Sequence, residues 1–310
     1  MKEFIITKKY ENKDIYSSLK KIFPHLSVSS LNKAFRIKDV KVNDIRVYKD
    51  YILRLNDIVK IYLNDNILFG LSKEIFYPYE DDNILVAYKP KGVISNFESY
   101  NEDNKNNLVP YFDELVKQDK KNDNLIICHR LDTNTEGLII FAKNKETHEE
   151  LLNAFKNNGI IKEYIALVYS KLPKNQDTLS CYILKDDKTG YSKIIDKSVK
   201  GAKSCITEYN VIKYIKNMNA SVISVKLHTG RTHQIRAHMK HLGNPVIGDS
   251  KYSTNTINDK FKTYTQMLFA SRYSFNFDAN SHLVYLNDVV INVTDKVLNT
   301  IQQTINNFNH

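Results

Sequence analysis

Two apolar runs of strand length flank a short polar segment near the middle of the chain. Residues 125–127 (Leu-Ile-Ile) precede it and residues 137–141 (Gly-Leu-Ile-Ile-Phe) follow it. The pattern predicts two strands joined by a turn or short loop. Asp132 would then lie at a loop mouth held by rigid elements, where catalytic groups are often placed. The alternative is a turn aspartate that bonds to nearby backbone amides.

Helical periods alternate with strand-like runs along the rest of the chain. Asn144 is a predicted N-cap for a helix whose apolar face holds Leu151, Leu152 and Phe155, and Gly159 would end it. Residues 232–241 predict another helix. Runs such as residues 84–88 predict strands. The mixture indicates an α+β fold with a mainly antiparallel sheet and flanking helices.

The first 63 residues form a separate pattern. Ile15, Leu19 and Ile22 predict a helix that breaks at Pro24, and residues 27–30 precede a second helix. Short strands are expected at residues 40–42 and 58–61. We therefore expect a small domain over residues 1–63, a polar linker over 64–73 and a larger domain over 74–310.

Basic charge is concentrated in this small domain. Residues 1–63 carry 14 Lys or Arg against 7 Asp or Glu, a net +7 of the chain's +10. The cations around the second predicted helix could form a phosphate-binding face or simply a solvated one, and the bias of a whole domain favours nucleic acid. The predicted RNA contacts here are Lys33, Arg36 and Lys38.

Composition limits the class of protein. The three cysteines form no Cys-x-x-Cys pair, which indicates neither a disulfide framework nor a zinc knuckle and suits a reducing cytoplasm. No apolar run reaches 18 residues and no secretion signal is visible, so we expect a cytoplasmic protein without membrane contact. Cys128 could be a thiolate nucleophile, but a buried structural cysteine is favoured.

Three further segments carry unusual polar chemistry. Lys89 opens "KPKGVISN" directly after a predicted strand, where it is either a surface charge or a phosphate contact. Lys162 and Tyr164 lie in "IIKEYIALVYS". The segment "LHTGRTHQIRAHMKHLGNPVIGDSKY" places Arg231, Arg236 and four histidines around one glycine turn and one helix.

These motifs together resemble the RluA-type family of RNA pseudouridine synthases. The family's H-R-L-D is residues 129–132, its K-x-Y-x-A is residues 162–166, and its L-x-T-G-R-x-H-Q-I-R-x-H is residues 227–238. The front of the chain resembles the S4 RNA-binding domain, with Asp44 where that domain normally has glycine. The chain also has Asn96 and Glu136 where family members often carry His and Ser.

The resemblance implies an isomerase that converts uridine to pseudouridine without a cofactor. Asp132 would be the catalytic nucleophile or base, attacking uracil C6 or ribose C1′ or removing the 2′ proton. Arg231 would be its ion-pair partner, because a planar guanidinium matches a carboxylate. Tyr164 would stack on the uracil or act as acid or base. The remaining RNA contacts would be His129, Arg130, Lys89, Lys162, His233, Gln234 and Arg236.

The four histidines of residues 227–241 could instead suggest a metal. No carboxylate stands among them at ligand spacing, and the adjacent arginines would repel a cation. We therefore expect hydrogen-bonded or RNA-facing histidines and no metal.

The resemblance also indicates the substrate. Large-subunit ribosomal RNA is expected, with tRNA as the alternative, and the protein is expected to be a monomer. Two other classes are open on the sequence: a non-catalytic RNA-binding ribosome-assembly factor, and an aspartate-nucleophile hydrolase of small molecules. The hydrolase would not need the basic front of the chain.

Overall fold

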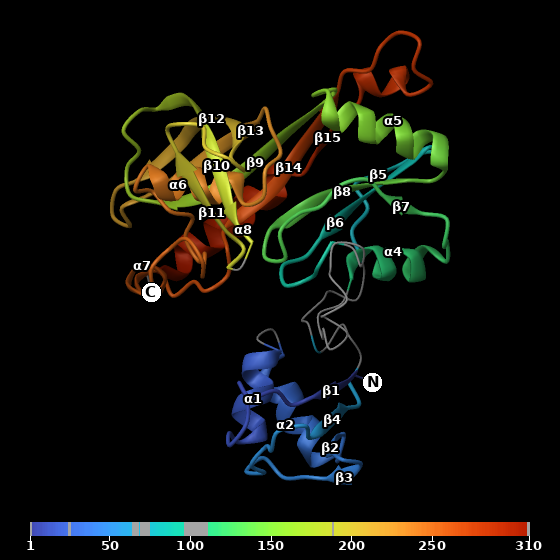
Figure 1. Cartoon of the computed structure of the whole chain (residues 1–310), viewed down its shortest axis with the longest axis vertical. Coiled ribbons are helices and arrows are strands. Elements are labelled where there is room, and N and C mark those ends of the chain that lie inside the picture. Colours follow the sequence, from blue (N-terminus) through green and yellow to red (C-terminus); the bar gives the residue numbers. More distant parts are fainter. Residues whose placement is uncertain are drawn as a thin grey trace. The chain divides into compact units, whose positions relative to one another are not determined.

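The computed structural model describes residues 2–23, 26–63, 68, 75–95, 111–187 and 189–308. They divide into two units, the first from Met1–Ile75 and Gly92–Asp123, the second from Phe76–Lys91 and Asn124–His310 (Figure 1). Apart from Leu68, which is buried in the core of the first unit, the expected linker at residues 64–73 lies outside the described residues, as do Pro24 and Asn96.

The first unit packs two short helices against a small antiparallel sheet. Its strands have the order β1-β4-β2-β3. Its elements are β1 (Lys2–Ile5), α1 (Ile15–Ile22), α2 (Val28–Arg36), β2 (Val40–Val42), β3 (Ile45–Arg46), β4 (Ile58–Ile61) and, in its second segment, α4 (Phe112–Lys120). The helices and strands predicted over residues 15–61 are confirmed.

Local chemistry explains these elements. Asp14 and Ser27 cap α1 and α2, each accepting the backbone N–H three residues on. Asn43 and Asp44 both have positive φ and join β2 to β3 as a two-residue loop, a geometry that Asn and Asp tolerate. Asp44 therefore fills the expected glycine position by turning in the left-handed region.

The second unit is built on one large mixed sheet. Its strand order is β11-β10-β12-β13-β9-β14-β8-β6-β5, with β15 beside β14 and β7 beside β8. All of these pairs are antiparallel except β14 with β8. The strands are β5 (Tyr79–Glu80), β6 (Ile84–Lys89), β7 (Ile126–Ile127), β8 (Glu136–Ala142), β9 (Ile160–Tyr169), β10 (Gln176–Asp186), β11 (Tyr191–Ile195), β12 (Lys203–Ile215), β13 (Ala220–Leu227), β14 (Leu268–Phe275) and β15 (Val290–Asn292). The expected α+β class is confirmed.

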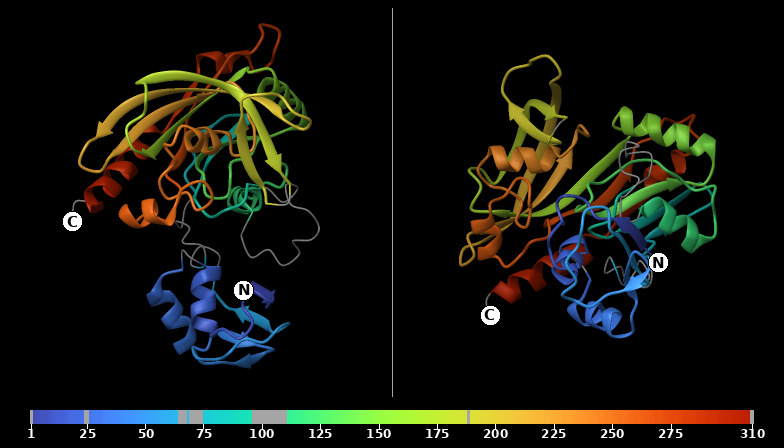
Figure 2. Two further views of the ribbon diagram at one scale, coloured as in Figure 1. Left: turned by 60° about the vertical axis from the view of Figure 1, so that its left-hand side comes forward. Right: turned by 60° about the horizontal axis from the view of Figure 1, so that its bottom comes forward.

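Helices lie against this twisted sheet (Figure 2). They are α5 (Lys145–Lys156), α6 (Gln234–His241), α7 (Asn255–Lys260), the 3₁₀ helix η3 (Val284–Asp288) and α8 (Thr294–Phe308). Asn144 caps α5 as predicted, its side chain accepting from the Thr147 N–H. The helix expected from residue 232 begins two residues later, at Gln234. Within the described part of the chain, no helix combines the length and apolarity needed to cross a membrane.

Candidate active site

Asp132 lies in the loop between β7 and β8, which hold both ends of the loop in register. The Cys128 N–H donates to the Ile140 carbonyl, and the His129 ring Nε2 accepts the Ile140 N–H at 3.0 Å. At the other end the Thr135 N–H donates to the Asp132 carbonyl. Asp132 therefore lies on a loop that is hydrogen-bonded at both ends, between the two strands predicted from the apolar runs.

A cavity of about 680 Å³ opens beside this loop. Its walls include apolar groups such as Phe155 and Leu268, and Asp132 is the one carboxylate among its lining residues in the described chain. Its lining cations are Arg130, Lys156, Lys162, Arg231 and Arg236. We call this space, between the Asp132 loop and the start of α6, the Asp132 cavity. Its size and positive lining suit an anionic ligand of nucleotide dimensions.

Arg236, rather than Arg231, is the ion-pair partner of Asp132. Its Nη1 donates to Asp132 Oδ2 at 2.7 Å, while Nε and Nη2 form a two-point contact with Asp249 at 2.7 and 2.9 Å. The expected Arg231 pair is wrong, because Arg231 precedes α6 and its Nε donates to the Ser204 carbonyl. Three of the five N–H groups of the Arg236 guanidinium are bonded to the two aspartates and Arg236 lines the cavity, so its RNA contact stays a prediction.

The environment of Arg236 keeps it charged. Burial opposes the charge, but the hydrogen bonds and negative charge of Asp249, together with Asp132, outweigh it and raise the pKa of Arg236. The guanidinium also lies over the Tyr252 ring at 4.9 Å. Only Oδ2 of the Asp132 carboxylate has a hydrogen-bond partner among the described residues, so Oδ1 is available to a ligand.

The residues before α6 fix its orientation. His233 adopts a left-handed conformation, with φ of 57°, and Gln234 is buried behind it. The Gln234 Oε1 accepts from Thr229 and the Arg231 N–H, while its Nε2 donates to the Ile206 carbonyl and Thr207. The expected RNA contact of Gln234 is therefore wrong, because its amide is fully used inside the protein.

His233 faces the Asp132 carboxylate more loosely. Its Nδ1 is 3.0 Å from the Tyr252 hydroxyl and its Nε2 is 3.7 Å from Asp132 Oδ2. Burial, opposed by the charge of Asp132, lowers the pKa of His233 to about 4, so the ring is neutral at neutral pH. His233 lines the Asp132 cavity, so a role toward a ligand stays a prediction.

Tyr164 and Lys162 enter the cavity from β9. Tyr164 is buried, and this burial, with the nearby charge of Asp132, raises its pKa, so the phenol keeps its proton at neutral pH. The Lys162 ammonium lies over the Phe155 ring at 5.6 Å and has no carboxylate partner within the described ranges. It is therefore a cation available to a ligand in the cavity.

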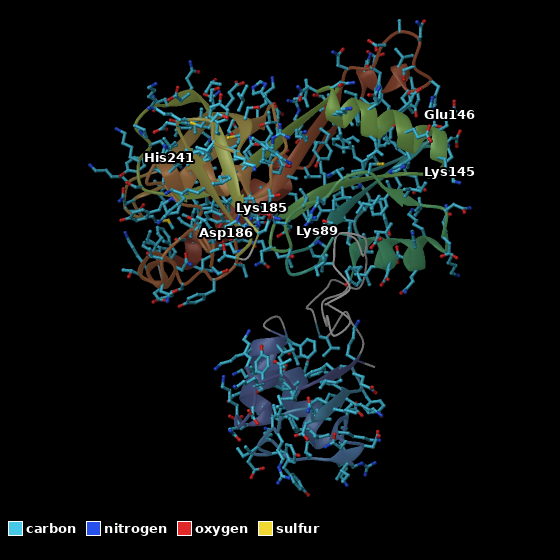
Figure 3. The ribbon with its side chains drawn as sticks, viewed as in Figure 1. Lys89, Lys145, Glu146, Lys185, Asp186 and His241 are labelled. Carbon is cyan, nitrogen blue, oxygen red and sulfur yellow. The ribbon has the colours of Figure 1, made fainter. Side chains whose placement is uncertain are left out.

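Lys89 is neither a surface charge nor a phosphate contact. It lies at the end of β6 (Figure 3), is fully buried, and donates to the carbonyls of Pro90 and Thr133. Desolvation lowers the pKa of Lys89 to about 7, opposed by the negative charges of Asp132 and Glu136. The expected RNA contact is wrong because the ammonium supports the Asp132 loop from within.

His129 and Arg130, adjacent on the loop, have different positions. The His129 ring packs against Phe155 and Tyr273, at centroid distances of 4.7 and 5.5 Å, and burial lowers its pKa to about 3. With its Nε2 bonded to the Ile140 N–H, His129 anchors the loop. Arg130 is exposed and lines the cavity wall, so its RNA contact stays a prediction.

The remaining histidines of this segment are largely hydrogen-bonded within the fold. His238 contacts Thr207 at 2.7 Å, and His228 pairs with Glu208 at 2.9 Å. No cluster of three metal-ligating side chains occurs among the residues that the structure describes. Cys128 is buried, as favoured, and burial raises the pKa of its thiol to about 12.

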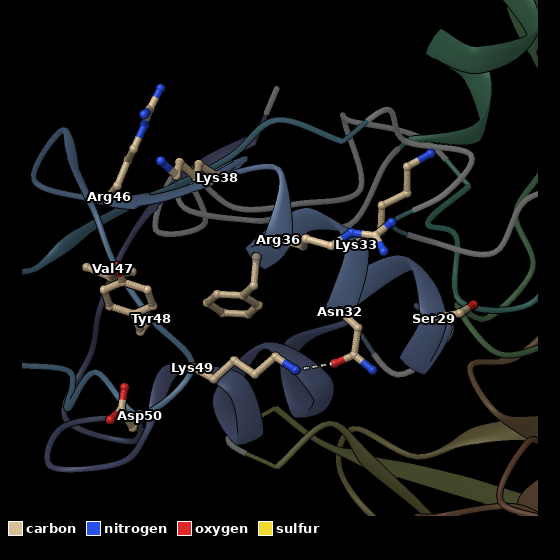
Figure 4. A pocket seen from close by; sticks show the side chains of 11 residues that line it. Ser29, Asn32, Lys33, Arg36, Lys38, Arg46, Val47, Tyr48, Lys49 and Asp50 are labelled. Atoms are coloured by element: carbon tan, nitrogen blue, oxygen red, sulfur yellow. Dashed lines mark hydrogen bonds between the residues drawn. The ribbon is translucent and has the colours of Figure 1, made fainter.

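A second cavity, of about 1230 Å³, lies in the first unit and contains the three basic residues predicted there (Figure 4). We call it the N-terminal cavity. It is lined by Ser29, Asn32, Lys33, Phe35, Arg36, Lys38, Arg46, Val47, Tyr48, Lys49 and Asp50. Five cations face one acid, which is consistent with a polyanionic ligand.

Two residues that complete the site had no role predicted from the sequence. Asp249 is fully buried and holds the outer edge of Arg236, and Tyr252 lies under that guanidinium. Both belong to the "GDSKY" end of the segment that carries Arg236. Asp249 follows α6 in the sequence and meets Arg236 only because the chain folds back after that helix, so no local sequence pattern could predict the contact.

Known proteins are similar to this chain over the segment that holds the site. Residues 83–241, which include the Asp132 loop and α6, match the family model described as RNA pseudouridylate synthase. The chain is 31% identical to an uncharacterized RNA pseudouridine synthase of Mycoplasma capricolum, over 94% of this chain and 97% of that one. It is 33% identical to the ribosomal large subunit pseudouridine synthase C of Rickettsia felis, over 81% and 84%.

A solved structure supports the fold. The structure titled human RNA pseudouridylate synthase domain containing 1 aligns with a TM-score of 0.53 at 21% identity, covering 74% of this chain and 95% of that one. The family match falls largely on the unit that holds the Asp132 cavity.

Proposed function

The chain belongs to the RNA pseudouridylate synthase family, isomerases that convert uridine to pseudouridine in RNA, and we propose that it modifies large-subunit ribosomal RNA through Asp132. The proposed substrate is supported by relatives named ribosomal large subunit pseudouridine synthase C, among them those of Rickettsia felis and Buchnera aphidicola, at 33% and 31% identity.

The role of Asp132 is supported mainly by one observation: only one of its two carboxylate oxygens has a hydrogen-bond partner within the described residues. Arg236 donates to Oδ2 and orients the carboxylate, whereas Oδ1 has no partner in the described chain and belongs to a residue that lines the Asp132 cavity. Both a nucleophile and a base need a carboxylate oxygen that the substrate can reach, and the Arg236 guanidinium, 2.7 Å from Oδ2, leaves Oδ1 in that position. The carboxylate is thus oriented before the substrate arrives.

The reaction rearranges bonds within one nucleotide. The bond between uracil N1 and ribose C1′ breaks, a bond between C5 and C1′ forms, the C5 hydrogen leaves as a proton, and N1 gains one. Asp132 would attack uracil C6 or ribose C1′, or remove the 2′ proton. Tyr164, protonated at neutral pH because burial raises its pKa, would stack on the freed base or donate a hydrogen bond.

Cations around the cavity would hold the RNA while the target uridine leaves its stack. Arg130 and Lys162 line the cavity from the loop and from β9. In the first unit, which we propose to be an S4-like RNA-binding domain, Lys33, Arg36 and Lys38 would bind phosphates at the N-terminal cavity.

The test is tritium release from 5-tritiated uridine in unmodified ribosomal RNA and, separately, in tRNA. Wild-type protein should release tritium from ribosomal RNA. Asp132→Asn should release none yet retain RNA affinity, because the side chain keeps its size and the cations that line the cavity are unchanged. Asp278→Asn, which alters an exposed carboxylate outside the cavity, is the matched control and should behave as wild type.

Each alternative outcome has a distinct meaning. Release from tRNA alone would replace the proposed substrate with tRNA. Wild-type release by Asp132→Asn would contradict the role of Asp132. Binding without release from either RNA would argue against both proposed substrates.

A further inference from the structure

The N-terminal cavity has an aromatic component that phosphate binding does not use. Tyr48 is 83% exposed, the most exposed of the large hydrophobic side chains in the described residues. Phe35, half-buried on α2, lines the same cavity. An exposed ring loses the free energy that its burial would provide. An exposed aromatic ring beside cations therefore suggests a binding surface for a flat ligand.

The cations of this cavity are available to a ligand. Within the described ranges, the side chains of Lys33, Arg36, Lys38 and Arg46 form no hydrogen bond or ion pair. Lys60, elsewhere in the same unit, is paired with both Glu3 and Asp44. Four cations without a hydrogen bond or ion pair in the described residues therefore line this one cavity.

The arrangement of these cations suits a nucleotide and its neighbours. In Figure 4, Arg46 and Lys38 lie toward one edge of the cavity, and Lys33 and Arg36 extend from α2 toward another. Cations at two edges can hold the phosphates on either side of a base that occupies the space between them.

We infer that the N-terminal cavity binds one unpaired RNA base, stacked on Tyr48, with its flanking phosphates held by the surrounding cations. This inference rests on the proposed RNA-binding role of the first unit. Bases inside a duplex have no free face, whereas a bulged or single-stranded base can stack on an aromatic ring. The cavity of about 1230 Å³ has room for a nucleotide. The site therefore selects RNA by the presence of an unpaired base.

The test compares two labelled RNAs by fluorescence anisotropy with the full-length protein. One is a blunt-ended duplex, and the other is the same duplex with a single bulged adenosine, which avoids selecting for uridine binding in the Asp132 cavity. Wild type should bind the bulged RNA more tightly. Tyr48→Ala should lower affinity for the bulged RNA by about tenfold and leave affinity for the blunt duplex within about twofold.

Two control variants sharpen the comparison. Tyr48→Phe keeps the ring and should keep the preference for the bulged RNA. Tyr264→Ala removes another exposed tyrosine, 67% exposed and outside both cavities, and should bind both RNAs as wild type does. Because Tyr48 is so exposed, its truncation should not unfold the unit.

A variant with fewer positive charges distinguishes base stacking on Tyr48 from the RNA-binding role of the first unit, on which the inference rests. Lys33→Gln combined with Arg36→Gln should weaken binding of both RNAs. If it does so while Tyr48→Ala changes neither affinity, or changes both equally, base stacking is refuted and phosphate binding stands. If the charge variant also has no effect, the RNA-binding role of this unit fails as well.

Discussion

Arg236 connects two carboxylates, and its removal should affect both folding and catalysis. Arg236→Ala would leave the fully buried Asp249 carboxyl group without its two-point partner. Removing one member of a buried pair costs about 3–5 kcal/mol, so the free energy of unfolding should fall by about this amount. Tritium release should be abolished. Urea denaturation and the release assay measure the two effects.

Arg231 is the matched control for this change. Its Nε contacts only the Ser204 carbonyl, at an exposed position, so Arg231→Ala should lower the free energy of unfolding by about 1 kcal/mol or less. If Arg231→Ala were as damaging to stability as Arg236→Ala, the assignment of the ion pair would be wrong.

The two arginines show what the sequence could and could not reveal. Asp132 could be located because apolar runs define the strands on both sides of it. Both arginines lie in one polar segment, and the left-handed turn at His233 determines which of them points at the carboxylate. That turn is stabilised by contacts of Gln234 with β12, which lie more than 25 residues away in sequence. No local pattern encodes such contacts.

A substitution of Lys89 tests whether this residue supports the Asp132 loop or contacts RNA. Lys89→Met would keep an apolar chain of similar length but leave the Pro90 and Thr133 carbonyls without this donor, beside Asp132. We expect kcat to fall about tenfold, an effect of about 1.4 kcal/mol, with RNA affinity unchanged. Lys156→Met, at a cation that lines the cavity, should raise KM and leave kcat unchanged. The reverse result would restore Lys89 as an RNA contact.

Among the elements, the parallel contact of β8 with β14 depends on one glycine. Gly137 has a φ of 128°, and a Cβ there would overlap the backbone of Ala270 on β14. Gly137→Ala should therefore lower the free energy of unfolding by about 3 kcal/mol or more. Gly243→Ala is the control, because Gly243 also has positive φ but has open space around it, and should cost about 1–2 kcal/mol. Similar losses from both would show that φ alone matters.

The position of β14 beside β8 could not be predicted from hydrophobic periodicity. The helices α1, α2 and α5 could be predicted because their caps and apolar faces lie within a dozen residues. By contrast, β14 inserts between β9 and β8, although about 100 residues separate it from β9 and about 125 from β8. Alternating hydrophobicity shows that a strand exists but does not identify its neighbours.

For the whole molecule, buried histidines should make folding sensitive to acid. Burial lowers the pKa of His129 to about 3 and those of His233 and His238 to about 4, against 6.5 for exposed histidine. Between pH 6.5 and about 4 the unfolded chain binds more protons, so stability declines as the pH falls through this range. At pH 5 each histidine should cost about 2 kcal/mol relative to pH 7. Urea denaturation at both pH values measures the sum.

His238→Gln isolates one of these contributions without changing the lining of the Asp132 cavity. His238 is fully buried against Thr207, and glutamine can keep a hydrogen bond there without a titrating group. The decrease in stability between pH 7 and pH 5 should shrink by about 2 kcal/mol. An unchanged decrease would mean that other groups cause the acid sensitivity.

The charge distribution of the chain predicts that RNA affinity and chemistry can be changed separately. Residues 1–63 hold +7 of the net +10, whereas the proposed reacting carboxylate belongs to the second unit. Replacing Lys33, Arg36, Lys38 and Arg46 by Gln should weaken RNA binding. The slope of log K against log salt should decrease by about 0.7 for each phosphate that the variant no longer neutralises. Tritium release at saturating RNA should be unchanged, because these cations take no part in the isomerisation. A lower maximal rate would instead require the N-terminal cavity to act in the chemical step, which a site that only binds RNA does not do.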